Sequence, residues 1–385
     1  MKVAVVLFNL GGPDSPEAVE PFLRNLFNDP AIIGAPGFVR RPLARFIAWR
    51  RAPVARAIYG EIGGRSPILP QTEAQARALE RVLSQRHPEI QFQAFVSMRY
   101  WNPLSDAVVP AVKAWNPDRV VLLPLYPQMS TATSESSVKD WFAAAARAGL
   151  HAPSHVVCCY PTQAGFVEAA AGLIRAAIDK LDGQPWRLLF SAHGLPEKVI
   201  RRGDPYQWQV EQSAAAIVRQ LALPNLDWGV CYQSRVGPLK WIGPSTESEI
   251  QRAGADRKAV VLFPVAFVSE HSETLVELDI EYRELAHKSG VPAFHRVGTV
   301  AIHDAFIGGL ASLVAGLVVA PDRWVVNDGN FAACPATHRR CPLTEQARMA
   351  TGQRPSSPLW PAAAAVATRA GATSTSSSSG VSRAE

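Results

Sequence analysis

The chain has 385 residues, of which 48% are hydrophobic and 19% are charged, and its net charge is +6. This composition excludes a wholly disordered chain, and the length favours two domains because single cores stop growing near roughly 250–300 residues. The positive charge favours an anionic ligand or a membrane surface. No run of Lys and Arg is dense enough to predict a nucleic-acid partner.

The chain opens with an apolar run, residues 3–10, followed by Gly11, Gly12 and Pro13. A first β-strand and a glycine turn explain this pattern better than a signal peptide does. The turn lacks the G-x-G-x-x-G spacing of a dinucleotide site. No uncharged apolar run reaches the length of about 18 residues that spans a membrane; residues 301–320 come nearest but carry His303 and Asp304, which favours a buried helix. We therefore expect a cytoplasmic protein, with peripheral contact at the inner membrane face as the only membrane association.

Strand-like and helix-like patterns alternate along the chain. Strands are predicted at residues 3–10, 91–98, 119–125, 155–160, 187–191, 226–232, 259–268 and 294–297. Helices are predicted at residues 15–27, 70–85, 105–115, 163–181, 205–221, 246–255, 273–289 and 304–319. Such alternation is typical of βαβ units, and so of parallel sheets covered by helices.

The pattern restarts after Tyr160, which predicts an α/β protein with two Rossmann-like, doubly wound domains. We expect domains at 1–160 and 161–303. Residues 304–351 should form a C-terminal helix and cysteine segment that packs on the first domain. The stretch 352–385 is rich in Pro and Ala and then in Thr and Ser, so we expect a disordered tail.

Two strand ends carry residues suited to proton or metal chemistry. His193 follows an apolar strand and precedes Gly194 and Pro196, at the place where open α/β sheets bind ligands. His271 and Glu273 follow the strand at 259–268 in the same way. A histidine here is commonly an ordinary turn residue. Two imidazoles and a carboxylate together favour a general base or a divalent ion such as Fe²⁺.

Two other features suit a large, flat, anionic ligand. Arg51 and Ser66 flank a glycine-containing segment, and guanidinium and hydroxyl groups can hold carboxylates. Aromatic residues recur near the predicted strand ends, although each alone would be read as core packing. They are Tyr100, Trp101, Tyr126, Trp241 and Phe267.

Several short motifs, in the same order, are those of a known family. The chain resembles ferrochelatases, the enzymes that insert Fe²⁺ into a porphyrin at the end of haem synthesis, from Leu7 to about Phe306. Each motif alone is weak evidence, but their combined order is highly specific. The motifs are Leu10–Pro13, Gly63–Pro67, Arg99–Tyr100, Pro124–Gln128, Ser191–Pro196, Arg202–Tyr206, Tyr232–Pro238, Trp241–Pro244 and His271–Tyr282.

The resemblance implies a chelatase fold of two four-stranded parallel sheets with an active-site cleft between them. It implies that His193 is the catalytic histidine and Glu273 the metal-site glutamate, with His271 beside them as a further metal ligand. An acidic path away from the centre would involve Glu277 and Asp279. The remaining positions concern the porphyrin: Arg51 and Ser66 would hold its propionates, and Leu10, Arg99, Tyr100 and Trp241 would line its cleft.

Five cysteines and no export signal argue against a disulfide framework. Some members of the resembled family hold a [2Fe–2S] cluster. Here Cys158, Cys159, Cys334 and Cys341 would supply four thiolates, and ordinary unpaired thiols are the alternative.

The predicted function is therefore a lyase that inserts Fe²⁺ into protoporphyrin IX, giving haem and two protons. Its partners would be a porphyrin and ferrous iron. The alternatives are a chelatase for coproporphyrin or another tetrapyrrole, and a non-catalytic tetrapyrrole or metal carrier on the same fold. A carrier has no need of a base opposite a metal site, so His193 and Glu273 favour the enzyme.

Overall fold

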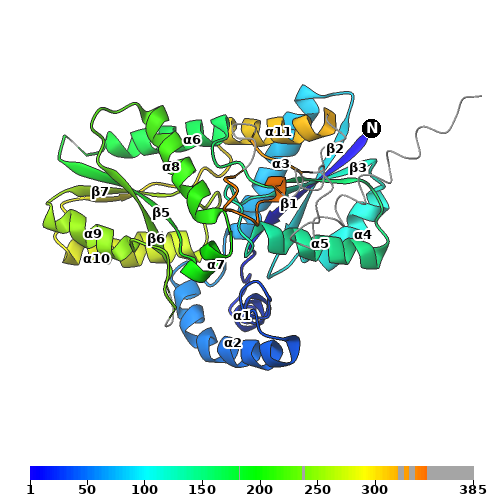
Figure 1. The fold of residues 1–385 in the computed structure, drawn as a ribbon, viewed down its shortest axis with the longest axis horizontal. Coiled ribbons are helices and arrows are strands. Elements are labelled where there is room, and N and C mark those ends of the chain that lie inside the picture. Colours follow the sequence, from blue (N-terminus) through cyan, green and yellow to red (C-terminus); the bar gives the residue numbers. More distant parts are fainter. Residues whose placement is uncertain (182, 236–238, 320–324, 329–333, 345–385) are drawn as a thin grey trace, which may run out of the picture.

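A computed structural model describes residues 1–181, 183–235, 239–319, 325–328 and 334–344. The predicted tail at 352–385 lies outside the described residues. Figure 1 shows two sheets side by side, with helices around each of them. The prediction of an α/β protein with two parallel sheets is confirmed.

The first sheet has the strand order β2-β1-β3-β4-β9, and every neighbouring pair is parallel. Its strands are β1 (Lys2–Asn9), β2 (Gln91–Met98), β3 (Arg119–Pro124), β4 (Ser154–Val157) and β9 (Val325–Val326). Four of these strands were predicted. The fifth strand, β9, corrects the expected count, and it comes from the C-terminal segment, where Val156 pairs with Val325. A strand of two residues is too short to give a recognisable alternation in sequence.

The second sheet has the order β6-β5-β7-β8, and it is also wholly parallel. It contains β5 (Trp186–His193), β6 (Trp228–Gln233), β7 (Ala259–Pro264) and β8 (Phe294–Arg296). The central strands β5 and β7 are almost entirely buried, as expected for a parallel sheet covered on both faces. Four strands agree with the prediction.

The helices of the first half are α1 (Val19–Phe27), α2 (Gly37–Gly60), α3 (Ile68–Arg86), α4 (Ser105–Trp115) and α5 (Ser134–Ala148). Those of the second half are α6 (Ala164–Ile178), α7 (Glu197–Arg201), α8 (Tyr206–Leu221), α9 (Thr246–Ala255), the π-helix η1 (Glu273–Glu281), α10 (Tyr282–Lys288) and α11 (Asp304–Val319). The pair α1–α2 stands off from both sheets on one side of the molecule (Figure 1).

One large apolar cluster spans both halves. Leu7 and Val121 of the first sheet belong to the same buried cluster as Phe190 and Val261 of the second. Helix α11 packs against both α3 and α6, and so joins the two halves. The division into domains at 1–160 and 161–303, with a C-terminal segment at 304–351, stays a prediction.

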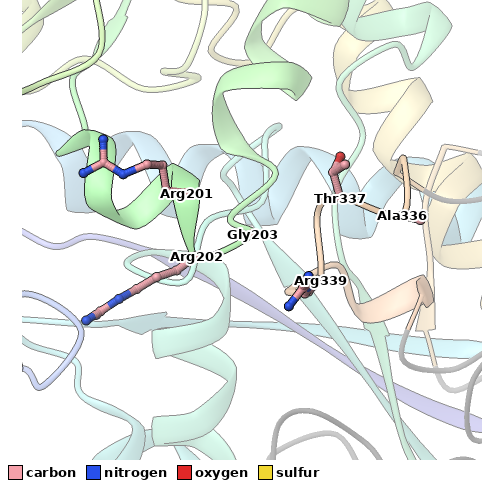
Figure 2. A pocket seen from close by; sticks show the side chains of 6 residues that line it. All are labelled: Arg201, Arg202, Gly203, Ala336, Thr337 and Arg339. Carbon is pink, nitrogen blue, oxygen red and sulfur yellow. The ribbon is translucent and has the colours of Figure 1, made fainter.

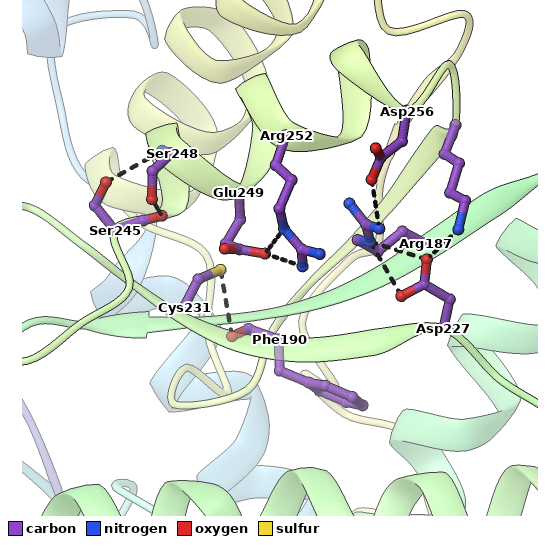
Figure 3. Close-up of polar contacts among 10 residues, drawn as sticks. Arg187, Phe190, Asp227, Cys231, Ser245, Ser248, Glu249, Arg252 and Asp256 are labelled. Carbon is purple, nitrogen blue, oxygen red and sulfur yellow. Dashed lines mark hydrogen bonds and ion pairs between the residues drawn. The ribbon is translucent and has the colours of Figure 1, made fainter.

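A buried arginine fixes the start of the second sheet. The Arg187 guanidinium on β5 lies 3.0 Å from an Asp227 carboxylate oxygen and 2.8 Å from one of Asp256 (Figure 3). Its side chain is only 4% exposed, and Lys258 completes the network through Asp227. A buried guanidinium with two carboxylate partners holds the strand, the loop before β6 and the end of α9 in register.

We expect Arg187→Ala to lower the free energy of unfolding by roughly 3 kcal/mol, because it removes the shared partner of two carboxylates and leaves a cavity. Arg252→Ala is the matched control. Arg252 pairs with Glu249 in the same region (Figure 3), but its side chain is half exposed, so the loss should stay below about 1 kcal/mol. Urea denaturation of the three proteins measures the difference. Equal losses in both variants would contradict this account of Arg187.

Within the part of the chain that the structure describes, no helix combines the length and hydropathy needed to cross a bilayer.

Candidate functional site

The ends of β5 and β7 bring together the residues at the centre of the site. Strand β5 ends at His193, and the loop after β7 leads through His271 into the π-helix, which begins at Glu273. Both strands are parallel neighbours, so their carboxyl ends lie at one edge of the sheet. A π-helix is rare and occurs mostly at functional sites, which agrees with its position here.

His193 and Glu273 form a direct pair. His193 Nδ1 lies 2.9 Å from Glu273 Oε2, although the residues are far apart in sequence. Burial alone would lower the pKa of His193, but the facing Glu273 carboxylate outweighs it, and the pKa lies above its ordinary 6.5. Burial opposes ionisation of Glu273, yet the charge of His193 holds the pKa of this carboxyl at about 2. Glu273 is therefore an anion at neutral pH.

The second histidine occupies a drier position. His271 is buried, its ring centroid lies 4.6 Å from that of Phe267, and its Nε2 lies 3.9 Å from Glu273 Oε2. Burial lowers the pKa of His271. The site thus holds one imidazole whose pKa is raised and one whose pKa is lowered, both near the same carboxylate oxygen of Glu273.

Glu277 continues the acidic side chains along η1. Its carboxylate accepts hydrogen bonds from Ser234 N at 2.8 Å, Gln233 Nε2 at 3.1 Å and Tyr282 Oη at 3.1 Å. Burial raises the pKa of Glu277, and the charge of Glu273 raises it further. Glu277, which is held by residues at the end of β6, therefore has a higher pKa than Glu273 and takes up a proton more readily.

Asp279 lies in a different environment from Glu277. Its carboxylate pairs with Arg296 and with Arg283, whose Nη2 is 3.1 Å away. Arg296 also binds Glu270 Oε1 at 2.7 Å. The structure therefore brings His193, Glu273, His271 and Glu277 together, whereas Asp279 joins an arginine network.

An apolar cavity of about 230 Å³ reaches Glu273 from the side of α1 and α2. The predicted residues Leu10, Arg51 and Ser66 all line it. Its other walls are mainly side chains of α1 and α2, with the turn that follows β1 and the segment that starts η1. They are Gly11, Phe22, Leu23, Leu26, Phe27, Val54, Ala55, Ile58, Tyr59, His271 and Ser272.

Arg99 and Tyr100 do not line this cavity themselves, although Tyr100 N donates a hydrogen bond to the carbonyl oxygen of the lining residue Leu10 at 2.9 Å. Arg99 Nη2 and Tyr100 Oη bind the same Asp29 oxygen, at 2.8 and 2.9 Å, and Ser136 also contacts it. Tyr100 is buried in the apolar cluster under α1 and α2. The pair therefore braces α1 against β2 and α5 behind the cavity wall.

Trp241 lies beside the loop that follows His193. It forms a β-bridge with Pro196, and its ring approaches Gly194, where an added Cβ would come 3.2 Å from Trp241 Cε3. The same Cβ would be 2.9 Å from the Gln233 carbonyl oxygen, so only glycine fits directly after His193.

Four of the five cysteines belong to one buried cluster of the first sheet, against which Trp208 of α8 packs. Cys158 Sγ and Cys159 Sγ are 3.3 Å apart, and Gln209 Nε2 lies 3.4 Å from Cys159 Sγ and 3.2 Å from Cys334 Sγ. A hydrogen bond with Cys334 lowers the pKa of Cys341. Among the residues described, no group of three or more His, Cys, Asp or Glu is arranged to hold one metal ion.

Some residues that shape the site carry no motif that would assign them a role from the sequence. Asp29 was not singled out, because nothing in the sequence connects it with Arg99. Tyr59 lines the cavity, and its hydroxyl lies 3.3 Å from Ser272 Oγ; burial raises the pKa of Tyr59 to about 12. The apolar walls from α1 and α2 were also missed, since α2 itself was not predicted.

The fold and the site define an α/β protein with paired parallel sheets, whose strand ends present an imidazole and a carboxylate next to an apolar cavity. The ferrochelatase family profile matches residues 2–317. The chain therefore belongs to the ferrochelatase family.

Relatives of the chain carry the family's name. A ferrochelatase from Phenylobacterium zucineum is 55% identical over 89% of this chain and 98% of that protein. Ferrochelatases from Caulobacter vibrioides and Pelagibacter ubique are 54% and 49% identical, over 90% and 89% of this chain and 99% and 98% of theirs. SirB from Bacillus subtilis with Fe³⁺ is a solved structure with a TM-score of 0.48 and 12% identity, covering 82% of this chain and 95% of SirB.

Proposed function

We propose that His193 takes protons from the porphyrin during iron insertion and that Glu273 positions it and meets the incoming metal. As a member of the ferrochelatase family, the protein is a metal-chelating lyase that makes haem by inserting iron into a porphyrin. The observation that carries the division of roles is the contact of 2.9 Å between His193 Nδ1 and Glu273 Oε2.

The contact with Glu273 selects one tautomer of neutral His193. A carboxylate accepts a hydrogen bond from Nδ1–H, and the lone pair is then on Nε2. The His193 side chain is 39% exposed, so that ring nitrogen is open to a substrate. Insertion of a divalent ion removes two pyrrole protons, and a base of near-neutral pKa is suited to accept them.

Glu277 is the next group toward which a proton can move. It lies on η1 one turn beyond Glu273, and burial together with the charge of Glu273 raises its pKa, so it takes up a proton more readily than an ordinary carboxylate. We propose that the proton path starts at His193 and continues through Glu273 and Glu277. Asp279 would act at most at the outer end, because Arg296 and Arg283 already neutralise it.

The metal is a substrate, and its proposed contacts are His193, Glu273 and the neutral imidazole of His271. Imidazole and carboxylate groups suit Fe²⁺. A protonated His193 repels a cation, so metal entry and proton removal are coupled at this pair. The iron would be guided to the ring centre and leave with the product.

We propose that the cavity that reaches Glu273 binds the porphyrin. Its apolar walls suit the porphyrin plane, and Arg51 and Ser66 suit a propionate at the rim. Leu10 and Trp241 would contact the macrocycle, whereas Arg99 and Tyr100 would act indirectly by bracing α1. Binding energy from the whole macrocycle can support distortion of the ring that exposes its nitrogen lone pairs.

The activity is tested by anaerobic incubation of the protein with Fe²⁺ and either protoporphyrin IX or coproporphyrin III, followed by absorbance. Enzyme at a small fraction of the porphyrin concentration should convert the free-base spectrum to that of the iron complex over many turnovers. A higher kcat/KM for one porphyrin identifies the preferred substrate. Binding of either porphyrin without turnover would favour the carrier alternative and contradict the proposal.

We also propose that the four clustered cysteines hold a [2Fe–2S] cluster. The sulfurs fit in kind and number, since such a cluster takes two thiolates on each iron. Cys158 and Cys159 form one pair, Cys334 and Cys341 the other, and Gln209 contacts a sulfur of each. A bound cluster would cross-link the β4 end to residues 334–341.

Protein purified without oxygen should therefore show visible absorbance and about two equivalents of non-substrate iron. Cys334→Ser should abolish both and lower thermal stability. Cys231→Ser is the control, because Cys231 is buried on β6 of the second sheet, where its Sγ contacts the Phe190 carbonyl (Figure 3), and this variant should keep the colour. A colourless, iron-free protein with full activity and stability would remove the cluster from the account.

For peripheral contact with a membrane, α2 offers the most suitable surface. It projects from the molecule beside α1 (Figure 1) and exposes large apolar side chains, with Phe38 at 81%, Trp49 at 63% and Val54 at 65%. Arginines at positions 40, 41, 45 and 50 are interleaved with them. Apolar and basic side chains on one helix suit the surface of an anionic bilayer. We propose that this helix rests on the cytoplasmic face of such a membrane.

Co-sedimentation with vesicles of anionic phospholipid tests this surface. Trp49→Glu should weaken binding roughly tenfold or more, because it replaces a large apolar contact by a charge that the anionic lipid repels. Ile302→Glu changes another exposed apolar residue, which lies in the turn before α11, and should leave binding unchanged. Equal binding of wild type and Trp49→Glu would exclude α2 as the contact.

A further inference from the structure

A second cavity, of about 450 Å³, lies between the end of α7 and residues 334–341, the cysteine loop. Its lining residues are Arg201, Arg202, Gly203, Ala336, Thr337 and Arg339. Three of the six are arginines and none is acidic. It shares no lining residue with the cavity that reaches Glu273. This charge and this position are not used by the proposed iron-insertion chemistry.

Figure 2 shows how the cavity is built. Arg201 and Arg202 extend from the end of α7, Gly203 lies in the middle, and Ala336, Thr337 and Arg339 come from the cysteine loop. The three arginines are exposed. Arg201 is partly neutralised by Glu197, at 2.9 Å, whereas no described residue pairs with the guanidinium of Arg202. Arg202 therefore contributes an uncompensated positive charge to this wall.

The two walls are held together through Gly203. Its φ is +96°, and its carbonyl oxygen accepts a hydrogen bond from Arg340 N at 3.1 Å. A Cβ at this position would lie 2.8 Å from Arg339 N, so the loop backbone requires glycine here. The Arg340 guanidinium pairs with the buried Glu135, which anchors the same loop to α5. Arg339 is thus set across from α7 by backbone contacts as well as by side chains.

We propose that this cavity binds a compact multivalent oxyanion, either a phosphate-type or a polycarboxylate ligand. Guanidinium forks pair with phosphate and carboxylate oxygens through two parallel hydrogen bonds. Arg202 supplies such a fork, Arg339 adds a second cationic side chain from the opposite wall, and the Thr337 hydroxyl adds a neutral donor. The bound anion bridges α7, which follows the catalytic loop after His193, to the loop that carries Cys334 and Cys341. Anion binding therefore stabilises the cysteine loop in its docked position.

The test titrates the full chain with pyrophosphate and, separately, with citrate by calorimetry at low salt. At least one should bind, and added NaCl should weaken the binding. Arg202→Ala and Arg339→Ala should each raise its Kd about tenfold. Arg202→Lys, which keeps the charge but loses the fork, should fall between wild type and Arg202→Ala. The anion with the lower Kd and the larger loss in the variants identifies the ligand class.

Arg219→Ala is the matched control, since Arg219 is exposed on α8 and does not line the cavity. It should bind like wild type. Thermal unfolding without ligand checks that each variant is folded, and the bound anion should raise the unfolding temperature of wild type but not of Arg202→Ala. The proposal is overturned if neither anion binds, or if Arg202→Ala and Arg339→Ala bind as tightly as Arg219→Ala. These outcomes do not depend on iron insertion.

Discussion

His193→Ala should reduce the rate of iron insertion by about 10²–10⁴-fold, the usual range for loss of a general base. The imidazole is half exposed at the end of β5, and its Nδ1 is engaged by Glu273, so Nε2 is the nitrogen available to the substrate. The neighbouring His271 does not replace it, because burial lowers the pKa of His271, which therefore accepts protons less readily.

The measurement is single-turnover insertion with saturating Fe²⁺, together with porphyrin binding followed by fluorescence. The Kd for porphyrin should change little, because the apolar walls and Arg51 remain. His287→Ala, at an exposed position on α10, controls for the loss of an imidazole. Near-normal insertion by His193→Ala would remove the residue from the chemistry.

Glu273→Gln should move the acid limb of the pH–rate profile to lower pH. In wild type the Glu273 carboxylate raises the pKa of His193 above 6.5, and the neutral imidazole that accepts a proton is formed only as the pH rises through this pKa. Activity should therefore rise with pH over that interval. Removing the negative charge lowers the pKa of His193, so the neutral form appears at lower pH. The pKa of Glu273 is about 2, so the carboxyl itself does not cause the limb.

The profile of kcat/KM against pH reports these groups in the free enzyme. The maximal rate of Glu273→Gln should also fall, because the amide neither fixes the tautomer as well nor attracts the metal. Glu281→Gln changes an exposed carboxyl at the far end of the same π-helix and should leave the limb in place. If the acid limb of Glu273→Gln lies at the same pH as that of wild type, the Glu273 carboxylate does not raise the pKa of His193, and this account is contradicted.

The strands were predictable because parallel strands are buried on both faces and read as continuous apolar runs, such as residues 259–264. Helix α2 was missed because Pro42 and Pro53 stand inside it, and proline usually marks the end of a helix. Helix α5 was missed since it begins with serines that favour turns, yet these residues are buried by the rest of the fold.

The sequence at the strand ends predicted which residues belong to the site, but it did not predict which side chains contact one another. Sequence put Glu273 near His271, whereas the contact with His193 depends on the pairing of β5 with β7. Arg99 was expected at the cleft wall. It instead binds Asp29, which is distant in sequence and carries no motif, so only the packing of α1 reveals the pair. Cys334 likewise comes close to Cys159 only because the C-terminal segment pairs with β4 as strand β9.

The central claim is that one imidazole and one carboxylate act as a single unit on the substrate, and a double-mutant cycle on single-turnover insertion tests it most directly. If His193 and Glu273 work together, the double variant His193→Ala with Glu273→Gln should be no slower than the slower single variant. If the two losses multiply, each group acts independently, and the shared site proposed here is contradicted.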